Sequence, residues 1–273
     1  MRPYEALSET EWAEVERIHD LIDEAEFESA RLSLDAMLTK RPGHPDLRIV
    51  DATLCLEEAE PSLALDALEG AERSADPAQF FYLRAAAHYD LVRFVPARAD
   101  AERAVAIHAA FPHGHDLLSR ILEHLGEPEA AHRAAEQARA LDPEMFPVPL
   151  DLDATEFDQL VQRSVKELPE PIKAKLEEIP VLVQDLPDAA MLTEDEPPLT
   201  PDLLGLFVGR HIFDEGSGTI PAAPGAIFLF RRNLLRACAD REELEREVRI
   251  TVQHEVGHLL GLDEDDLDEW GLA

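Results

Sequence analysis

Two histidines and a glutamate near the C-terminus have the types and spacing needed to bind a metal ion and activate water. They occur in the string His254-Glu255-Val256-Gly257-His258. Residues four apart lie on one face of an α-helix, so both imidazoles can reach a single zinc ion. Glu255 lies between them, where it can act as general base on a zinc-bound water. The motif therefore predicts a Zn²⁺ site at His254 and His258, with Glu255 as the catalytic residue of a peptide-bond hydrolase.

A third zinc ligand is expected just after the motif, because catalytic zinc usually has three protein ligands. Only 15 residues follow His258, which favours a compact site. Gly261 is a typical residue at the end of a helix, and Glu264 follows the turn that it would make. We therefore predict Glu264 as the third ligand. The alternatives that the sequence leaves open are Asp263, Asp265 and His211.

The residues before the motif predict the helix that would carry it. Asp240 and Glu243 have the spacing of a capping box. Apolar residues then recur at roughly helical spacing, at Leu244, Val248, Val252, Leu259 and Leu262. Gly257 costs about 1 kcal/mol in a helix interior relative to alanine, so its presence indicates that another backbone or a substrate passes close by. A bare motif of this kind also occurs by chance, but this context favours the metal site.

Composition limits the classes of partner. The chain has 273 residues and a formal net charge of -33, which argues against nucleic acid and against an anionic membrane surface. The N-terminus has no apolar signal-peptide core, and no stretch approaches the roughly 18 apolar residues of a membrane span. Cys55 and Cys238 are predicted to be reduced, buried side chains in different domains. These features predict a soluble, cytoplasmic protein.

The first half of the chain is predicted to be a helical repeat. Proline-containing turns recur at Pro42, Pro77, Pro112 and Pro143, with spacings of 35, 35 and 31 residues. A period in the mid-thirties is typical of tetratricopeptide (TPR) repeats, and the unit over 115–143 resembles the TPR pattern of small residues. We therefore expect an α-solenoid of TPR-like helical hairpins over residues 1–145. Its groove would hold a peptide or protein partner, unless the repeats serve only as a scaffold.

A proline-rich linker separates this half from a second domain, predicted over residues 151–273. The fold class is therefore mostly α, with a small α+β domain at the C-terminus. The predicted elements of that domain are helices over 154–168, 172–179 and 233–239, strands over 181–183, 203–208 and 226–230, and the motif helix.

Over about 154–270 the second domain resembles the small zincin-like metallopeptidases, sometimes called minimal zincins. The resemblance rests on the segments 157–161, 168–169, 181–187, 204–209, 227–231 and 248–262. It implies an acidic third ligand at the position of Glu264. One departure is Leu259, where members often carry a polar residue or histidine. No methionine follows Met191, so the methionine turn of the metzincins is missing.

Two functions are consistent with these features. The first is a zinc metallopeptidase in which the TPR-like domain binds the protein or peptide substrate. The alternative is a non-catalytic TPR interaction protein with a structural or vestigial zinc site. For a peptidase, an oxyanion partner is expected among His211, Arg231 and Arg232. The strand over 226–230 is expected to hold an extended peptide by edge pairing.

Overall fold

The computed structural model describes residues 5–72, 75–177, 179–194, 196–209 and 225–259. The chain divides into two compact units. The first, which we call the repeat unit, comprises Met1–Pro147 with Thr193–Leu199, and the second, the sheet unit, comprises Val148–Leu192 with Thr200–Ala273.

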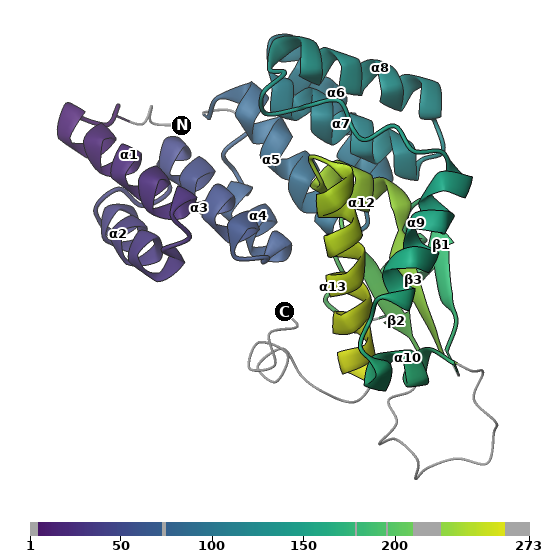
Figure 1. The fold of residues 1–273 in the computed structure, drawn as a ribbon. Helices are drawn as coiled ribbons and strands as arrows, with labels where there is room; N and C mark the ends of the chain where they lie inside the picture. The colour runs from purple at the N-terminus through teal and green to yellow at the C-terminus, as the bar shows by residue number, and fades with distance from the viewer. Residues whose placement is uncertain (1–4, 73–74, 178, 195, 210–224, 260–273) are drawn as a thin grey trace. The chain divides into compact units, whose positions relative to one another are not determined.

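The repeat unit consists of helix pairs stacked one upon the next, as the repeat pattern predicted (Figure 1). The pairs are α1 (Glu9–Asp23) with α2 (Phe27–Lys40), α3 (Pro45–Glu57) with α4 (Pro61–Leu68), α5 (Pro77–Asp90) with α6 (Phe94–Ile107), and α7 (Pro112–His124) with α8 (Pro128–Leu141). Within each pair the two helices pack on each other, and the first helices α1, α3, α5 and α7 also contact one another in turn. The N-terminal half is thus mostly helical, with each pair contacting its neighbours.

The turn inside each helix pair repeats with a period of 33 or 34 residues. Its marker is a residue with positive φ, at Ala25, Ala59 and Val92 (φ 57° each) and at Gly126 (φ 72°). A buried alanine follows each of these five residues later, at Ala30, Ala64, Ala97 and Ala131. A side chain no larger than a methyl group lets the second helix approach the first closely. These markers define the repeat more regularly than the prolines on which the sequence analysis relied.

The proline positions have two different structural roles. Pro77 and Pro112 begin α5 and α7, where the missing N–H costs nothing because it has no partner within the helix. Pro42 instead lies in the turn before α3, which begins at Pro45, and Pro143 lies in the turn after α8. The predicted turns are therefore correct, although the prolines do not occupy equivalent positions in them.

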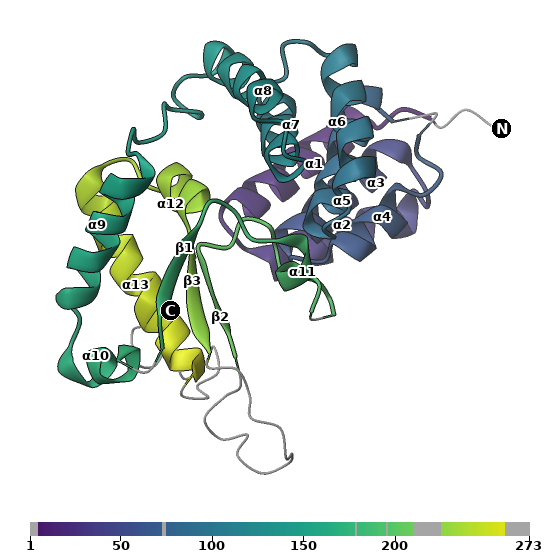
Figure 2. The same cartoon turned by 90° about the vertical axis from the view of Figure 1, so that its right-hand side faces the viewer.

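The described part of the sheet unit contains three strands and the helices that cover them. The helices are α9 (Ala154–Lys166), α10 (Glu170–Leu176), α11 (Ala189–Leu192), α12 (Arg231–Ala237) and α13 (Arg241–Leu259). The strands are β1 (Val181–Gln184), β2 (Gly205–Val208) and β3 (Ala226–Phe230), in the order β1-β3-β2 (Figure 2). β1 pairs with β3 in parallel, with Leu182 opposite Phe228, and β2 pairs with β3 antiparallel, with Leu206 opposite the same residue.

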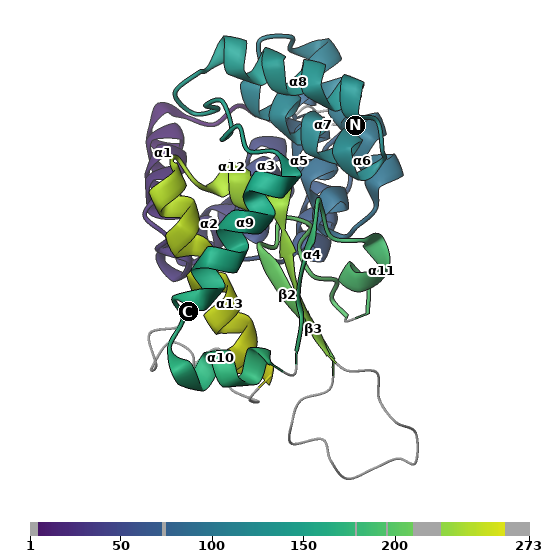
Figure 3. The same cartoon turned by 45° about the vertical axis from the view of Figure 1, so that its right-hand side comes forward.

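The core of this unit lies between the sheet and two helices. α9 crosses α13 on one side of the three strands (Figure 3). Phe157 and Leu160 of α9 are fully buried, and they belong to one apolar cluster with Ile227, Leu229 and Val252. Residues far apart in sequence therefore share a single core.

Most of the predicted elements of the sheet unit are confirmed, with corrections. α10 and α12 each begin two residues earlier than expected, and α11 was not predicted. The expectation that the strand over 226–230 offers a free edge is wrong, because β3 is the central strand and is paired on both sides. In the described sheet the edge strands are β1 and β2.

Two further predictions from composition can be checked. Cys55 and Cys238 are buried free thiols, as expected. Burial raises the pKa of Cys238 to about 11, so this thiol stays protonated at neutral pH. In the described part of the chain, no helix is both long and apolar enough to span a membrane.

Candidate functional site

The zinc motif lies in the last two turns of α13, the longest helix of the sheet unit. The N-terminus of α13 is capped as the sequence predicted, since the Glu243 N–H donates to Asp240 Oδ1 at 2.9 Å. The Glu243 carboxylate accepts a hydrogen bond from the N–H of Ala239 at 2.7 Å. In the expected capping box the donor would be the next residue, Asp240. Because α13 is helical through Leu259, His254 and His258 lie on the same face of one unbroken helix.

Glu255 extends from α13 to the strand β2. Its carboxylate is buried, with only 6% of the residue exposed. Its Oε2 accepts a hydrogen bond from the N–H of Phe207, with a donor–acceptor distance of 2.6 Å. A donor from the backbone stabilises the ionised form of a carboxylate, which is the form that a general base requires. The structure thus places the predicted catalytic residue against a strand that lies 48 positions away in the sequence.

Gly205 allows β2 to approach α13 at this point. A Cβ atom at position 205 would lie 2.5 Å from Thr251 Cγ2, 3.1 Å from the carbonyl oxygen of Phe228 and 3.5 Å from Glu255 Cγ. At 2.5 Å the Thr251 side chain would have to shift, and the Phe228 carbonyl oxygen leaves little room on the other side, so a residue without a side chain fits best here. The close approach sets the distance from the backbone of β2 to Glu255.

Asn233 fixes the segment that leads into β2. This α12 residue is 4% exposed, and its Nδ2 donates to the carbonyl oxygens of Pro201 and Leu203 at 2.9 and 2.8 Å. Sequence reasoning missed both Asn233 and Phe207, because neither belongs to a recognisable motif. A glycine inside an apolar strand was the one signal that could have drawn attention to this region.

The described residues include part of the predicted metal site. His254 is half-buried on α13, and the side chain of His258 is not among those described. Glu264 and its alternatives Asp263, Asp265 and His211 lie outside the described residues. Within the described ranges no group of three or more metal-binding side chains occurs. Two histidines one helical turn apart, with a carboxylate to follow, are a donor set that suits zinc.

Both arginines considered as oxyanion partners bind Asp185, the residue that follows β1. Arg231 Nη2 and Arg232 Nε lie 2.7 and 3.5 Å from the Asp185 carboxylate, and Arg231 Nη1 also donates to the carbonyl oxygen of Leu152. These contacts join the end of β1 to the start of α12. The role of either arginine at an oxyanion stays a prediction.

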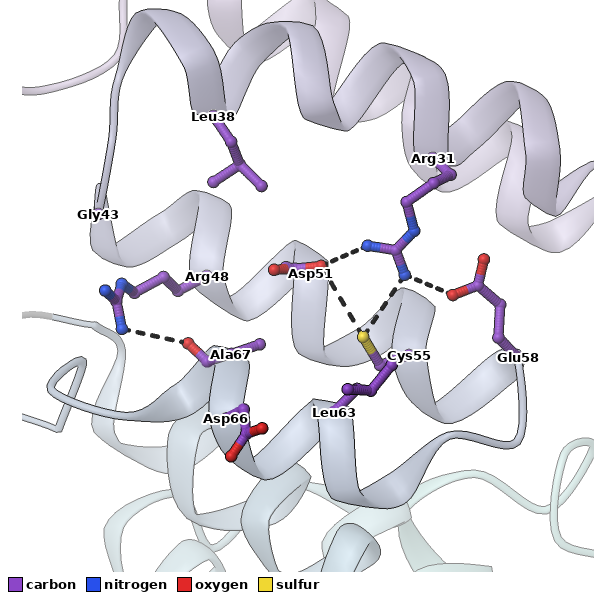
Figure 4. A pocket seen from close by; sticks show the side chains of 10 residues that line it. All are labelled: Arg31, Leu38, Gly43, Arg48, Asp51, Cys55, Glu58, Leu63, Asp66 and Ala67. Atoms are coloured by element: carbon purple, nitrogen blue, oxygen red, sulfur yellow. Dashed lines mark hydrogen bonds and ion pairs between the residues drawn. The ribbon is translucent and has the colours of Figure 1, made fainter.

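The repeat unit contains an open groove of about 570 Å³ (Figure 4). Its floor is one stripe of α3, and α2 and α4 contribute to its walls. The residues that line it are Arg31, Leu38, Gly43, Arg48, Asp51, Cys55, Glu58, Leu63, Asp66 and Ala67. Arg31 crosses from α2 to α3, where it pairs with Asp51 at 2.5 Å and also with Glu58. Burial raises the pKa of the Cys55 thiol above its ordinary value, so Cys55 is not a nucleophile here.

Comparison with known proteins identifies the C-terminal part of the chain. Residues 176–272 match the family of zincin-like metallopeptidases, so the C-terminal part carries a zincin-like metallopeptidase domain. This confirms the resemblance seen in the sequence from residue 176 onward, and the matched segment includes all of the predicted ligands. No curated protein matches the chain. Among solved structures, the crystal structure of MamA is 17% identical, with a TM-score of 0.40, over 46% of this chain and 74% of MamA.

Proposed function

We propose that the sheet unit is a zinc-dependent peptidase, in which His254, His258 and Glu264 hold the metal and Glu255 is the general base. The observation that carries the proposal is the position of Glu255. Its buried carboxylate lies on the helix that bears both histidines and against the edge strand of the sheet. The match of this region to the zincin-like metallopeptidases supports the same chemistry.

In the proposed hydrolysis the metal, Glu255 and the Phe207 N–H have separate roles. Bound zinc would supply a Lewis acid that polarises a carbonyl group and acidifies water. Glu255 takes a proton from the attacking water as its oxygen bonds to the carbonyl carbon. Glu255 then gives the proton to the amine as the carbon–nitrogen bond breaks. The Phe207 N–H favours the ionised carboxylate with which this cycle begins.

The experiment that tests the function compares wild type with Glu255→Gln at matched zinc content. Glutamine keeps the size of the side chain and removes the base. We expect Glu255→Gln to retain about one zinc per chain and to lose cleavage of a broad peptide library. His254→Ala and His258→Ala should instead lose the metal. Zinc-loaded wild type that cleaves no more than Glu255→Gln would favour a non-catalytic interaction protein.

The identity of the third ligand has its own test. Glu264→Ala should weaken zinc binding far more than Asp263→Ala, because a carboxylate that is a direct ligand cannot be lost without opening the site. Zinc affinity measured by competition with a chelator distinguishes the two variants. The opposite order would assign the ligand to Asp263.

We further propose that the repeat unit binds a basic, partly apolar segment of the substrate polypeptide in the groove between α2 and α4. Leu63 is 51% exposed at this groove, and Asp66 lines it together with Arg48 and with Asp51 and Glu58, both of which pair with Arg31. The net charge of -33 favours a basic ligand. Leu63→Glu should change which library peptides are cleaved and leave zinc content unchanged. Leu32→Glu is the control, because Leu32 is 75% exposed on α2 and does not line the groove.

A further inference from the structure

The backbone groups of β2 alternate between β3 and the outer edge of the sheet. The Phe230 N–H donates to the carbonyl oxygen of Leu204 at 2.9 Å, so the backbone of Leu204 faces β3. In an antiparallel pair the facing groups alternate along the strand. Leu206 therefore also faces β3, whereas the N–H groups of Gly205 and Phe207 point away from it. The N–H that binds Glu255 is thus on the edge of the sheet.

An edge N–H of this kind is normally exchangeable with water or available to another chain. Here it donates to the buried side chain of Glu255, with a donor–acceptor distance of 2.6 Å. Hydrogen bonds to charged groups contribute about 1.5–3 kcal/mol, which is more than a neutral pair contributes. This bond therefore holds the carboxylate of Glu255 in one orientation relative to the sheet.

The strand that supplies the donor is itself held from two sides. On one side, Gly205 lies against Thr251 of α13, one turn before Glu255. On the other, Asn233 binds the carbonyl oxygens of Pro201 and Leu203, just before β2 begins. A shift of β2 along its axis would break the Asn233 bonds and bring a side chain into the space at Gly205.

We propose that β2 positions the general base, with the Phe207 main-chain N–H as the positioning group and with Asn233 and Gly205 holding the strand in register. This inference deepens the proposed peptidase function and rests on it for its catalytic consequence. The claim about position does not depend on peptidase activity, because it concerns a contact within the protein.

The contact is tested by amide hydrogen exchange, measured by NMR on the full chain. Glu255→Ala removes the acceptor and should accelerate exchange of the Phe207 amide by roughly tenfold to a hundredfold, the range expected for a hydrogen bond to a charged group. The amide of Leu206, which faces β3, is the internal control and should be unchanged. Glu255→Gln keeps a neutral acceptor and should give an intermediate rate. Equal exchange in wild type and Glu255→Ala would overturn the proposal.

The catalytic consequence is tested by removing the donor from β2. Proline is tolerated in an edge strand where the N–H faces away from the ladder, so Phe207→Pro deletes this donor without breaking a bond to β3. Phe207→Ala is the matched control, because it also loses the ring but keeps the N–H. With zinc content equal, kcat on a library peptide should fall about tenfold or more in Phe207→Pro relative to Phe207→Ala, with KM within about threefold.

The outcomes separate the two proposals. Equal kcat values for Phe207→Pro and Phe207→Ala would overturn the positioning role. Should Phe207→Pro fail to fold, Asn233→Ala is the second variant, and it should accelerate exchange at Phe207 and lower kcat with zinc retained. If wild type cleaves no peptide, the proposed function fails, and the exchange measurement still decides whether β2 holds Glu255.

Discussion

The two units of this protein differ in how far apart in the sequence their contacting residues lie. In the repeat unit each helix packs on its neighbours in the sequence, and the same turn recurs along the chain. In the sheet unit the decisive contacts span long stretches, such as Phe207 with Glu255 and Asp185 with Arg231. Repeated local contacts produce a regular surface. Long-range contacts instead bring side chains from several elements close together.

The largest expected effect is the loss of stability when a core leucine is shortened. It should spread through the single core of the sheet unit but stay local in the repeat unit. Leu34 of α2 and Leu160 of α9 are both fully buried, so Leu34→Ala and Leu160→Ala should each cost about 2–5 kcal/mol of unfolding free energy. Protection from hydrogen exchange should fall throughout β1, β3 and α13 for Leu160→Ala. For Leu34→Ala the loss should stay within α1 to α3, because stacked repeats couple to their neighbours only. Loss of protection in α7 and α8 would contradict the comparison.

A glycine in each unit gives the next contrast. Gly205→Ala should cost about 1–3 kcal/mol, because its Cβ would lie 2.5 Å from Thr251 Cγ2 and 3.1 Å from the Phe228 carbonyl. Gly114→Ala on α7 meets the side chain of Phe111 at 2.9 Å. Val105 Cγ1 would lie 3.1 Å away, so both close neighbours are side-chain atoms and no backbone atom blocks the added methyl group. Alanine also gains about 0.5–1 kcal/mol over glycine in a helix, which offsets part of the cost of shifting them.

Denaturant unfolding of both variants checks this contrast. We expect Gly114→Ala to be nearly neutral. The steric clash in Gly205→Ala should be partly relieved when Thr251→Ser is added, since serine lacks the Cγ2 methyl group. Equal destabilisation of the two alanine variants would mean that the sheet unit tolerates the extra atom as well as the repeat unit does.

A smaller effect should appear at the turn that repeats. Val92 has a φ of 57° at the position that Gly126 occupies in the next pair. A residue with a side chain is destabilised by about 1–2 kcal/mol in this left-handed backbone conformation, and glycine avoids that strain. Glycine also loses more conformational entropy on folding, which cancels part of the benefit. Val92→Gly should therefore stabilise the repeat unit by less than about 1 kcal/mol. Val95→Gly, in the first turn of α6, should destabilise it by about 0.2–0.5 kcal/mol, and thermal unfolding would reveal the opposite signs.

The smallest effect is a dependence on pH at the first helix. Hydrogen bonds from Arg41, and then from Ser8, lower the pKa of Glu11 from 4.5 to about 2. A carboxylate with a lowered pKa stabilises the folded chain above its unfolded pKa, and this contribution disappears as the pH falls through the folded value. Glu11→Gln should therefore reduce stability at pH 6 and converge with wild type near pH 2.

Acid titration of unfolding midpoints checks this expectation. Glu16→Gln is the control, because Glu16 is an exposed residue of the same helix. A wild-type curve that runs parallel to that of Glu11→Gln from pH 6 to pH 2 would show that the Arg41 ion pair contributes nothing.

Much of the fold follows from patterns that act over short distances. The helix pairs follow from helix-forming residues interrupted by turns, and the three strands follow from short apolar runs bounded by proline and glycine. The start of α13 follows from Asp240, whose side chain caps it. The predicted bounds of α10 and α12 are less accurate, because the ends of short helices depend on the contacts that they make.

The order of the strands in the sheet could not be read from the sequence in the same way. The run over 226–230 has the composition of a strand at any place in a sheet, and only pairing with both β1 and β2 makes it central. The edge strand beside Glu255 is therefore β2, which sequence reasoning had not chosen.

The sequence by itself determined the chemistry that this protein could perform. Two histidines four apart and an intervening glutamate are specified by local spacing, since a helix fixes the directions of neighbouring side chains. Tertiary structure alone decided that Glu255 meets the N–H of Phe207 and that Gly205 and Asn233 hold the strand there. The physical reason is that such contacts join residues tens of positions apart, and only the packing of the whole unit brings them within bonding distance.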